Sequence, residues 1–564
     1  MNRLIRFQGI LAIAFGILVL RLAYLQVLRG GHYRRLAEQN RLRLVSEQAP
    51  RGLIVDREGR VLATNQTTFR LAVVPQEVRD PQRIFAAVSP LVHQSVEALQ
   101  REYTRSRSAA YMPATIASRV PKEVAIRLEE ERWRTPGLLV RHEMTRHYPG
   151  GSCAAHLLGY LSQPTAEEWP LLKHYGIRPY DLVGRMGIER LLDEALRGRS
   201  GGVMVEVNHR GRQVRMLGRR TPQVGEKVIL TIDAPLQSLI EQAFGAQPGA
   251  AVVLNPETGA VLAMVSQPAF APEAFIGPDR DAVQGFLTDA RSPLLNRATV
   301  GAYQPGSIVK LITAMAALEH RVITPSTTIH CPGSLTLGDR TFHCWNREGH
   351  GSLTLAEAVM QSCNVYFMQV GRRLGLARLR AAMDQVGFSH RTGWPMEEQT
   401  GHLPQRRMTQ GEVAMLALGQ GEVLITVVQA AVMASAFANG GWLVEPWVVS
   451  AIGEHSFESK ASRRRLGWSA EAIRAVRAGM HAVVRNPSGT GSRAFSETVS
   501  IAGKTGTAQT HVPGQTHGWF VGFCPVEQPR AALAVLAEYG GSGGELPSEI
   551  ARQICEYLNL PHQV

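Results

Sequence analysis

Lysine is scarce in this chain of 564 residues. Only six of its 61 basic residues are lysine, and the other 55 are arginine. Arginine serves wherever only positive charge matters, but it does not release its proton in proteins. The few lysines are therefore enriched at sites that need a compact or deprotonatable amine. They are Lys122, Lys173, Lys227, Lys310, Lys460 and Lys504.

Cysteine and charged residues are also limited. Six cysteines are too few for a disulfide scaffold. Charged residues make up 19% and hydrophobic residues 45%, which excludes a disordered basic protein despite the net charge of +14. The length implies more than one domain. The basic balance suits a surface near anionic lipid or cell-wall polymer, and no motif supports nucleic acid as a partner.

One apolar stretch, residues 7–28, is long enough to cross a membrane. Its polar residues are Gln8, Arg21 and Gln26, and Arg21 can extend toward an interface. No small-x-small cleavage pattern follows, so the sequence predicts a retained single-span anchor with residues 1–6 as a cytoplasmic tail. The alternative is a buried amphipathic helix.

The stretch Tyr303–Lys310 predicts a nucleophile. Glycine and proline break the backbone, and an apolar run over 308–318 then predicts a helix with Ser307 in its first turn. Ser307 and Lys310 are three residues apart, so they lie on one face of a helix. A neutral lysine can take the serine proton, and the helix N-terminus favours an oxyanion. The alternative is a chance S-x-x-K pattern on a core helix.

Two further motifs follow in order. Ser362-Cys363-Asn364 falls in a predicted helix-to-helix turn, and Lys504-Thr505-Gly506-Thr507 opens a strand-like segment. The ordered set S-x-x-K, S-x-N and K-T-G resembles penicillin-binding proteins and serine β-lactamases. Each motif alone is weak, whereas the ordered triple in a basic, anchored chain is strong.

The resemblance implies a role for each catalytic residue. Ser307 attacks the carbonyl of a D-alanyl-D-alanine peptide, with Lys310 as general base. Ser362 relays a proton to the leaving D-alanine nitrogen, and Asn364 holds the substrate amide and Lys310. Lys504 supplies positive charge beside the substrate carboxylate.

The K-T-G residues are also expected to supply substrate contacts. Thr505 offers a hydroxyl to the carboxylate, and Gly506 lets the backbone approach closely. The backbone N–H groups of Ser307 and Thr507 are the candidate oxyanion hole.

Four other segments are similar to class B penicillin-binding proteins: the 51–65 hairpin, 187–189, the 206–211 hairpin and 419–422. The segment 342–351, leading into 362–367, is similar to the elongation type of that class. The resemblance implies a D,D-transpeptidase that cross-links peptidoglycan stem peptides, is inhibited by β-lactams, and works beside a SEDS-type glycan polymerase and elongation scaffold proteins. Asn364 departs from the usual Asp of this type.

The expected fold is α/β (α+β). We predict a β-lactamase-like transpeptidase domain over 236–564, with a central antiparallel sheet between helices. Residues 29–235 are expected to form an elongated, mixed pedestal without catalytic residues, in the periplasm with the catalytic domain.

Cys331, Cys344, His350 and Cys363 form a candidate zinc site. Three cysteines and a histidine are a common structural zinc set, although their spacing is not that of a standard finger. The resemblance implies zinc, since elongation-type enzymes carry a zinc site here. The alternatives are a Cys331–Cys344 disulfide or buried free thiols. The remaining cysteines are expected to be core residues: Cys153, Cys524 and Cys555.

Rival functions share the three motifs. A β-lactamase is disfavoured by size and anchor, whereas the sequence does not separate a transpeptidase from a D,D-carboxypeptidase. A non-turnover β-lactam-sensing receptor would need more membrane spans and a cytoplasmic domain. The 342–351 segment argues against a division-type enzyme.

Overall fold

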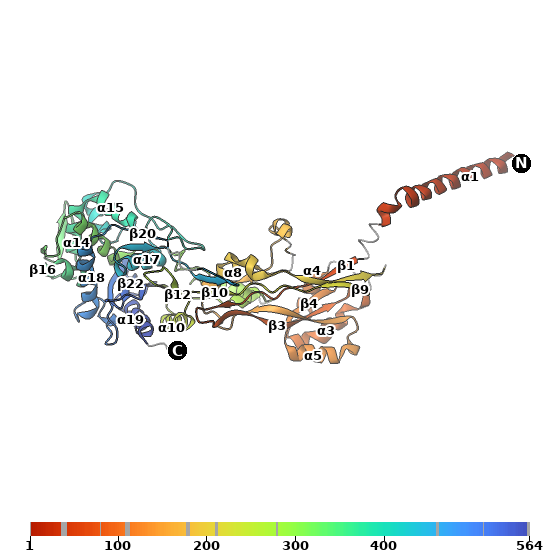
Figure 1. The fold of residues 1–564 in the computed structure, drawn as a ribbon, viewed down its shortest axis with the longest axis horizontal. Coiled ribbons are helices and arrows are strands. Elements are labelled where there is room, and N and C mark those ends of the chain that lie inside the picture. The colour runs from red at the N-terminus through yellow and green to blue at the C-terminus, as the bar shows by residue number, and fades with distance from the viewer. Residues whose placement is uncertain are drawn as a thin grey trace. The chain divides into compact units, whose positions relative to one another are not determined.

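The protein, described here by a computed structural model, divides into two compact units (Figure 1). The first comprises Met1–Arg51, Asn65–Thr145 and Arg197–Gly225, and the second Gly52–Thr64, Arg146–Leu196 and Glu226–Val564. The described residues are 2–34, 42–78, 80–107, 113–175, 177, 181–208, 213–277, 280–457, 462–510 and 512–560. The domain boundaries drawn from the sequence stay predictions.

The first unit begins with the apolar helix. Helix α1 (Asn2–Ala23) continues as a π-helical stretch, η1 (Tyr24–Leu28). The segment Phe7–Leu28 has a mean hydropathy of 2.2, and none of it is buried against the protein. The alternative of a helix buried in the core is therefore wrong, and its length and composition suit a membrane span.

The rest of the first unit contains both strands and helices. Strand β8 (Gly201–Val207) pairs antiparallel with β1 (Leu42–Glu47) and β9 (Gln213–Arg220). The predicted hairpin is confirmed by the β8–β9 pairing, although its tip, 209–211, lies outside the described residues. A second hydrophobic core includes Leu71, Phe85 and Leu99. The elements around it are β3 (Val61–Val73), β4 (Ala114–Val120), β5 (Leu138–His147), α3 (Pro81–Val92), α4 (Val96–Ser106) and α5 (Lys122–Glu130).

A five-stranded antiparallel sheet organises the second unit. Its order is β12-β11-β23-β22-β21. The strands are β11 (Gly249–Leu254), β12 (Val261–Gln267), β21 (Ala502–Gln509), β22 (Thr516–Cys524) and β23 (Ala531–Ala537). The predicted antiparallel sheet is confirmed, as is the predicted hairpin formed by β11 and β12.

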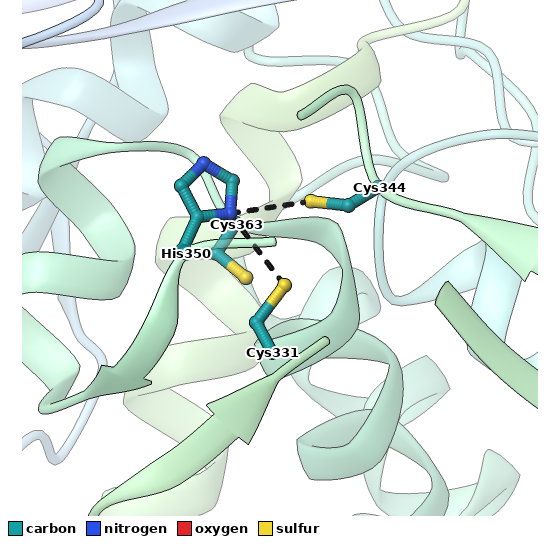
Figure 2. A group of neighbouring side chains, drawn as sticks. All are labelled: Cys331, Cys344, His350 and Cys363. Carbon is teal, nitrogen blue, oxygen red and sulfur yellow. Dashed lines mark hydrogen bonds between the residues drawn. The ribbon is translucent and has the colours of Figure 1, made fainter. Parts of the chain in front are cut away.

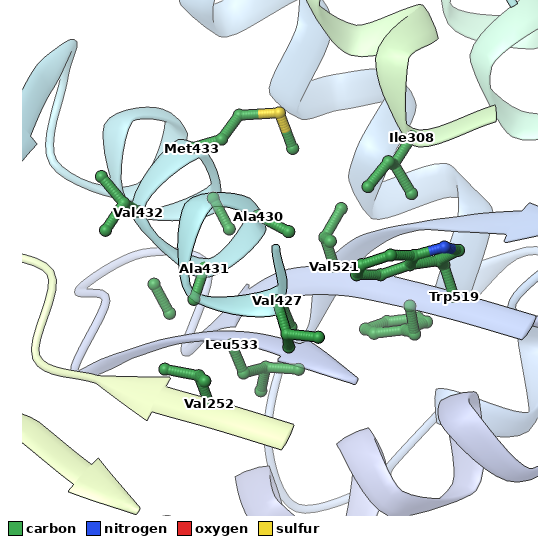
Figure 3. Close-up of a cluster of buried hydrophobic side chains, with 14 of the residues drawn as sticks. Val252, Ile308, Val427, Ala430, Ala431, Val432, Met433, Trp519, Val521 and Leu533 are labelled. Atoms are coloured by element: carbon green, nitrogen blue, oxygen red, sulfur yellow. The ribbon is translucent and has the colours of Figure 1, made fainter. Parts of the chain in front are cut away.

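Helices cover both faces of this sheet. Helix α17 (Val427–Ala438) is buried at every position and lies over β11, β22 and β23, with Val252, Val521 and Leu533 beneath it (Figure 3). Helix α19 (Leu546–Asn559) contacts β22 and β23, and α10 (Ala234–Phe244) contacts β12 and packs against α19. A helix that is apolar all round except for Gln429 and Ser435, as α17 is, is expected only where both of its sides are covered.

A helical region beside the sheet carries the first two motifs. Its helices are α12 (Lys310–Glu319), α13 (Leu355–Met360), α14 (Asn364–Leu374), α15 (Leu376–Gln385), α16 (Gln410–Leu416) and α18 (Ala470–Arg485). Two short ribbons join it: β13 (Ile329–Cys331) with β16 (Gly351–Leu353), and β14 (Ser334–Leu337) with β15 (Arg340–His343).

Short elements complete the second unit. The predicted 51–65 hairpin is present, since β2 (Ile54–Val55) pairs antiparallel with the start of β3. Strand β10 (Val228–Leu230) lies between β2 and β18 (Val449–Ile452). The others are β6 (Leu161–Ser162), β7 (Val183–Gly184), β17 (Trp442–Val444), β19 (His455–Ser456), β20 (Arg463–Arg465), α6 (Ala155–Leu158), α7 (Trp169–Leu172), α8 (Gly187–Leu191) and α11 (Arg280–Thr288), and α9 (Asp193–Arg197) ends at the border with the first unit.

One cysteine prediction is wrong. Cys524 and Cys555 are buried, as expected, but they form a disulfide rather than standing as separate core residues. They lie 31 residues apart, at the end of β22 and within α19, and the packing of that helix on the sheet brings them together. Cys153 is a free, partly buried thiol.

Candidate active site

Ser307 lies in a tight turn at the start of α12. The turn is a 3₁₀ helix, η6 (Gly306–Val309), which runs into the α-helix, so the predicted helical position of Ser307 is confirmed with a tighter first turn. Gly306 has φ of +56°, and a Cβ there would lie 2.8 Å from the Thr507 carbonyl oxygen. Only glycine fits this approach without strain. Ser307 is partly exposed while Ile308 and Val309 are buried, so its hydroxyl can be reached by a substrate.

Lys310 is fully buried and directed at the S-x-N turn. Its Nζ donates to the Ser362 carbonyl oxygen at 2.7 Å, to Asn364 Oδ1 at 2.7 Å and to Ser362 Oγ at 3.2 Å. Among the hydrogen bonds of the described residues, none involves the Ser307 hydroxyl. In the neutral form the amine has two hydrogens, enough for the two 2.7 Å contacts to the Ser362 carbonyl oxygen and Asn364 Oδ1. Its lone pair can then accept a hydrogen bond from a neighbouring hydroxyl.

The S-x-N turn connects α13 to α14, as predicted. Ser362 has φ of +53°, a left-handed conformation that non-glycine residues rarely adopt and that tends to occur at functional sites. Cys363 caps α14 by accepting a hydrogen bond from the Tyr366 backbone N–H at 3.4 Å. The turn directs the Ser362 hydroxyl toward both lysines.

The K-T-G segment lies on the edge strand β21. Lys504 is fully buried, and its Nζ donates to Ser362 Oγ at 2.8 Å and to the Thr505 carbonyl oxygen at 2.9 Å. A Cβ at Gly506 would lie 2.9 Å from the Pro305 carbonyl oxygen, so this strand and the Ser307 turn lie in direct contact. Thr507 is exposed.

Sequence reasoning missed Thr490. The Thr505 hydroxyl, which we expected to face substrate, donates to Thr490 Oγ1 at 2.7 Å. Thr490 stands in the small-residue run Ser488-Gly489-Thr490-Gly491-Ser492, a turn pattern ahead of the K-T-G strand that marks a loop but gives no partner. Gln420, from the 419–422 segment, also contacts the strand through a 3.3 Å hydrogen bond to the Thr507 carbonyl oxygen.

Both lysines are perturbed in the same direction. Burial lowers the pKa of Lys310 to about 8. Burial, and then the neighbouring Lys310 charge, hold the pKa of Lys504 well below its usual value. Both amines contact one hydroxyl, that of Ser362, so two full positive charges are disfavoured there. At neutral pH, the two amines are therefore suited to carrying no more than one positive charge between them.

The predicted metal ligands come together beside this site (Figure 2). Cys331, Cys344, His350 and Cys363 offer four ligand atoms that all lie within 4.8 Å of one another. His350 Nδ1 is 3.5 Å from the sulfurs of both Cys331 and Cys344. These thiols are free, so the alternative Cys331–Cys344 disulfide is absent.

The donor set fits zinc. Tetrahedral coordination at standard Zn–S and Zn–N lengths places nitrogen about 3.6 Å from sulfur, close to the observed 3.5 Å. A hydrogen bond between the two thiols lowers the pKa of Cys344 and raises that of Cys363, so one of this pair is readily a thiolate and the other would lose its proton on binding the metal. Cys363 lies between Ser362 and Asn364, so the cluster adjoins the S-x-N turn.

Comparison with known proteins identifies the family. The profile of the penicillin binding protein transpeptidase domain matches residues 249–556, and that of the penicillin-binding protein dimerisation domain matches 46–230. Peptidoglycan D,D-transpeptidase MrdA of Haemophilus influenzae is 32% identical, over 98% of this chain and 91% of the relative. The chain belongs to the class B penicillin-binding proteins of the elongation type.

Solved structures of similar penicillin-binding proteins agree. Penicillin-binding protein PBP2 of Helicobacter pylori in complex with MreC has a TM-score of 0.79 and 26% identity, over 92% of this chain and 99% of that one. A chain from a structure titled as a peptidoglycan synthase complex that coordinates polymerization and crosslinking has a TM-score of 0.75 and 29% identity, over 100% of this chain and 99% of that one.

Proposed function

We propose that this penicillin-binding protein is a peptidoglycan D,D-transpeptidase that cross-links stem peptides during cell-wall elongation and is inhibited by β-lactams. The observation that carries the proposal is the Ser362 hydroxyl, which contacts the amines of Lys310 and Lys504 at 3.2 and 2.8 Å. This single hydroxyl joins all three sequence motifs next to a reachable serine. The relatives named MrdA favour cross-linking in elongation over the division-type and sensing alternatives.

The first half of the reaction forms an acyl-enzyme on Ser307. Neutral Lys310 takes the hydroxyl proton as Ser307 Oγ attacks the carbonyl carbon of the penultimate D-alanine. Backbone N–H groups of Ser307 and Thr507 receive the oxyanion. The proton then passes through Ser362 to the nitrogen of the terminal D-alanine, whose peptide bond breaks. Asn364 orients Lys310 by accepting a hydrogen bond from its amine, which is 2.7 Å long in the free protein.

The second half reverses these proton movements. The amine of a second stem peptide attacks the ester carbonyl, gives its proton back through Ser362 and Lys310, and releases Ser307. Lys504 with Gly506 and Thr507 binds the donor's terminal carboxylate before acylation, and Thr505 joins them when its hydroxyl turns from Thr490. That carboxylate restores the charge of Lys504, whose pKa is depressed in the free protein.

Zinc, held by Cys331, Cys344, His350 and Cys363, would act as a structural cross-link and supplies no step of the reaction. The two ribbons bring three of these ligands from residues 331–350, and Cys363 adds the fourth from within the S-x-N motif. The ion would therefore fix the backbone on which Ser362 and Asn364 stand.

The anchor and domains follow from the same proposal. Residues 7–28 cross the inner membrane once with 1–6 in the cytoplasm, 29–235 form the pedestal, and 236–564 form the catalytic domain in the periplasm. A SEDS-type polymerase and an elongation scaffold protein are the expected partners, in line with the complexes formed by the structural relatives.

Covalent labelling tests the function. Full-length protein in detergent is treated with a fluorescent penicillin, beside Ser307→Ala, and the adduct is located by intact mass and peptide mapping. A stable adduct on Ser307 that the variant lacks is expected, followed by cross-linking of lipid II products with a partner polymerase. Rapid penicillin turnover without an adduct would instead indicate a hydrolase.

A further inference from the structure

The turn that carries Ser307 is fixed by more than its own helix. Tyr303 forms a two-way backbone bridge with Ile425 at 2.9 Å, and the Gly306 N–H donates to the Gly419 carbonyl at 3.0 Å. The indole of Trp519 donates to the Gln304 carbonyl at 2.9 Å. These hydrogen bonds hold the backbone of the turn in place.

The side chain of Tyr303, four residues before the nucleophile, is buried. Its ring is 7% exposed, and its hydroxyl donates to Glu538 Oε1 at 2.8 Å. The other oxygen of Glu538 accepts from Arg297 Nε at 2.7 Å. Burial and the adjacent carboxylate raise the pKa of Tyr303, so the phenol remains a hydrogen-bond donor.

Glu538 and Arg297, the other two members of this network, are both tied to the central sheet. Glu538 directly follows β23, and its backbone exchanges hydrogen bonds with Pro248 and Gln247 ahead of β11. Arg297 is 4% exposed; its backbone N–H donates to Ser266 of β12 and its guanidinium also donates to the carbonyl oxygens of Ser292 and Arg291. The Glu538 carboxylate is thus held in place at the end of β23 by hydrogen bonds on both of its oxygens.

The same sheet holds the K-T-G motif. Trp519, which holds Gln304, is paired in register with Gly506 on β21. The sheet therefore positions both the strand that binds the substrate carboxylate and, through Tyr303 and Trp519, the turn that presents Ser307. An error of about 1 Å in such an alignment costs up to about a hundredfold in rate.

We propose that Tyr303, Glu538 and Arg297 are positioning residues that set Ser307 against the K-T-G strand for acylation. The proposal rests on the proposed acyl-enzyme function and deepens it. None of the three residues touches the reacting atoms. Their effect is on the rate constant of acylation, k2, and not on the initial, non-covalent binding of the ligand.

The chain offers a matched control. Arg146 Nε donates to Glu189 Oε1 at 2.7 Å, and the Tyr148 hydroxyl donates to the same oxygen at 3.2 Å, all three residues being buried in the same unit. The same three residue types are joined as in the Tyr303 network, although here both donors share one carboxylate oxygen. These residues belong to none of the three motifs. Tyr148→Phe therefore removes the same hydroxyl from the same kind of buried pair.

The test measures acylation of the full-length protein in detergent by a fluorescent penicillin at a series of concentrations, which separates k2 from the Kd of the non-covalent complex. Tyr303→Phe is expected to lower k2 by about tenfold and to leave Kd within about twofold, whereas Tyr148→Phe leaves both unchanged. Glu538→Gln keeps a hydrogen-bond acceptor for Tyr303, so its k2 is expected to fall less than that of Glu538→Ala. Adding Tyr303→Phe to Glu538→Ala should cost nothing further.

The outcomes separate the two proposals. An unchanged k2 in Tyr303→Phe, or an equal loss in Tyr148→Phe at matched thermal stability, overturns the positioning role alone. Additive losses in the double variant also overturn it. A wild-type protein that is not acylated at Ser307 overturns the proposed function and the positioning role with it.

Discussion

Ser362 is the residue on which the proton movements depend. Its left-handed backbone places one hydroxyl within hydrogen-bond reach of two buried amines, and no carboxylate is among the described partners of either amine. When two lysines share a hydroxyl in a buried site, the positive charge of one disfavours the charged form of the other. Lys310 can thereby act as a base, although a lysine in water is fully protonated at neutral pH. The Ser362 hydroxyl that it contacts can act as the proton relay.

The pH dependence of acylation follows from Lys310. Because burial lowers its pKa to about 8, the neutral base is lost as pH falls through 8. Acylation should fall about tenfold for each unit below the pKa and level off above it. Stopped-flow labelling between pH 6 and 10 measures this profile.

Lys310→Arg provides the control for that profile. Arginine keeps its charge across the range, so acylation should drop by about 10²- to 10⁴-fold and lose its rising limb. A variant with the wild-type midpoint would falsify the assignment of Lys310 as the base.

At the level of elements, the disulfide joins the C-terminal helix to the sheet. Closing a loop of 31 residues stabilises a fold by about 3–4 kcal/mol in the chain-entropy account. The double variant Cys524→Ala/Cys555→Ala should therefore unfold at clearly lower denaturant than wild type, whereas Cys153→Ala, which removes a free thiol, should change little. Equal unfolding midpoints for the two would contradict a stabilising bond.

The Cys/His cluster makes a second prediction at this scale. Purified protein should contain about one zinc per chain by elemental analysis, and Cys344→Ser or prolonged chelation should remove it. Because Cys363 lies inside the S-x-N motif, the metal-free protein should lose thermal stability and acylate more slowly. His343→Ala, at the histidine that the cluster leaves out, should keep its zinc; loss of metal there would assign the ligands differently.

Elements that depend on local pattern could be predicted from the sequence, and contacts that depend on register could not. The apolar run of the anchor, the β11–β12 hairpin and the S-x-N turn each follow from neighbouring residues. Tyr303 meets Glu538 across 235 positions, and Thr505 meets Thr490 across 15. Nothing local distinguishes such a tyrosine or threonine from any other core or loop residue. The Cys524–Cys555 pair could not be predicted for the same reason.

For the whole molecule, the apolar N-terminal helix and the catalytic site belong to different units. Every residue of the site belongs to the second unit, and the apolar helix belongs to the first. A chain that lacks residues 1–28 should therefore be acylated by penicillin at the full-length rate. In vesicles that contain a partner polymerase and lipid II, however, it should cross-link at least about tenfold more slowly, because a shared membrane raises the effective concentration of the partners. Slower acylation of the truncated chain would show that the anchor supports the site itself, and undiminished cross-linking would show that contacts outside the span are enough to hold the polymerase.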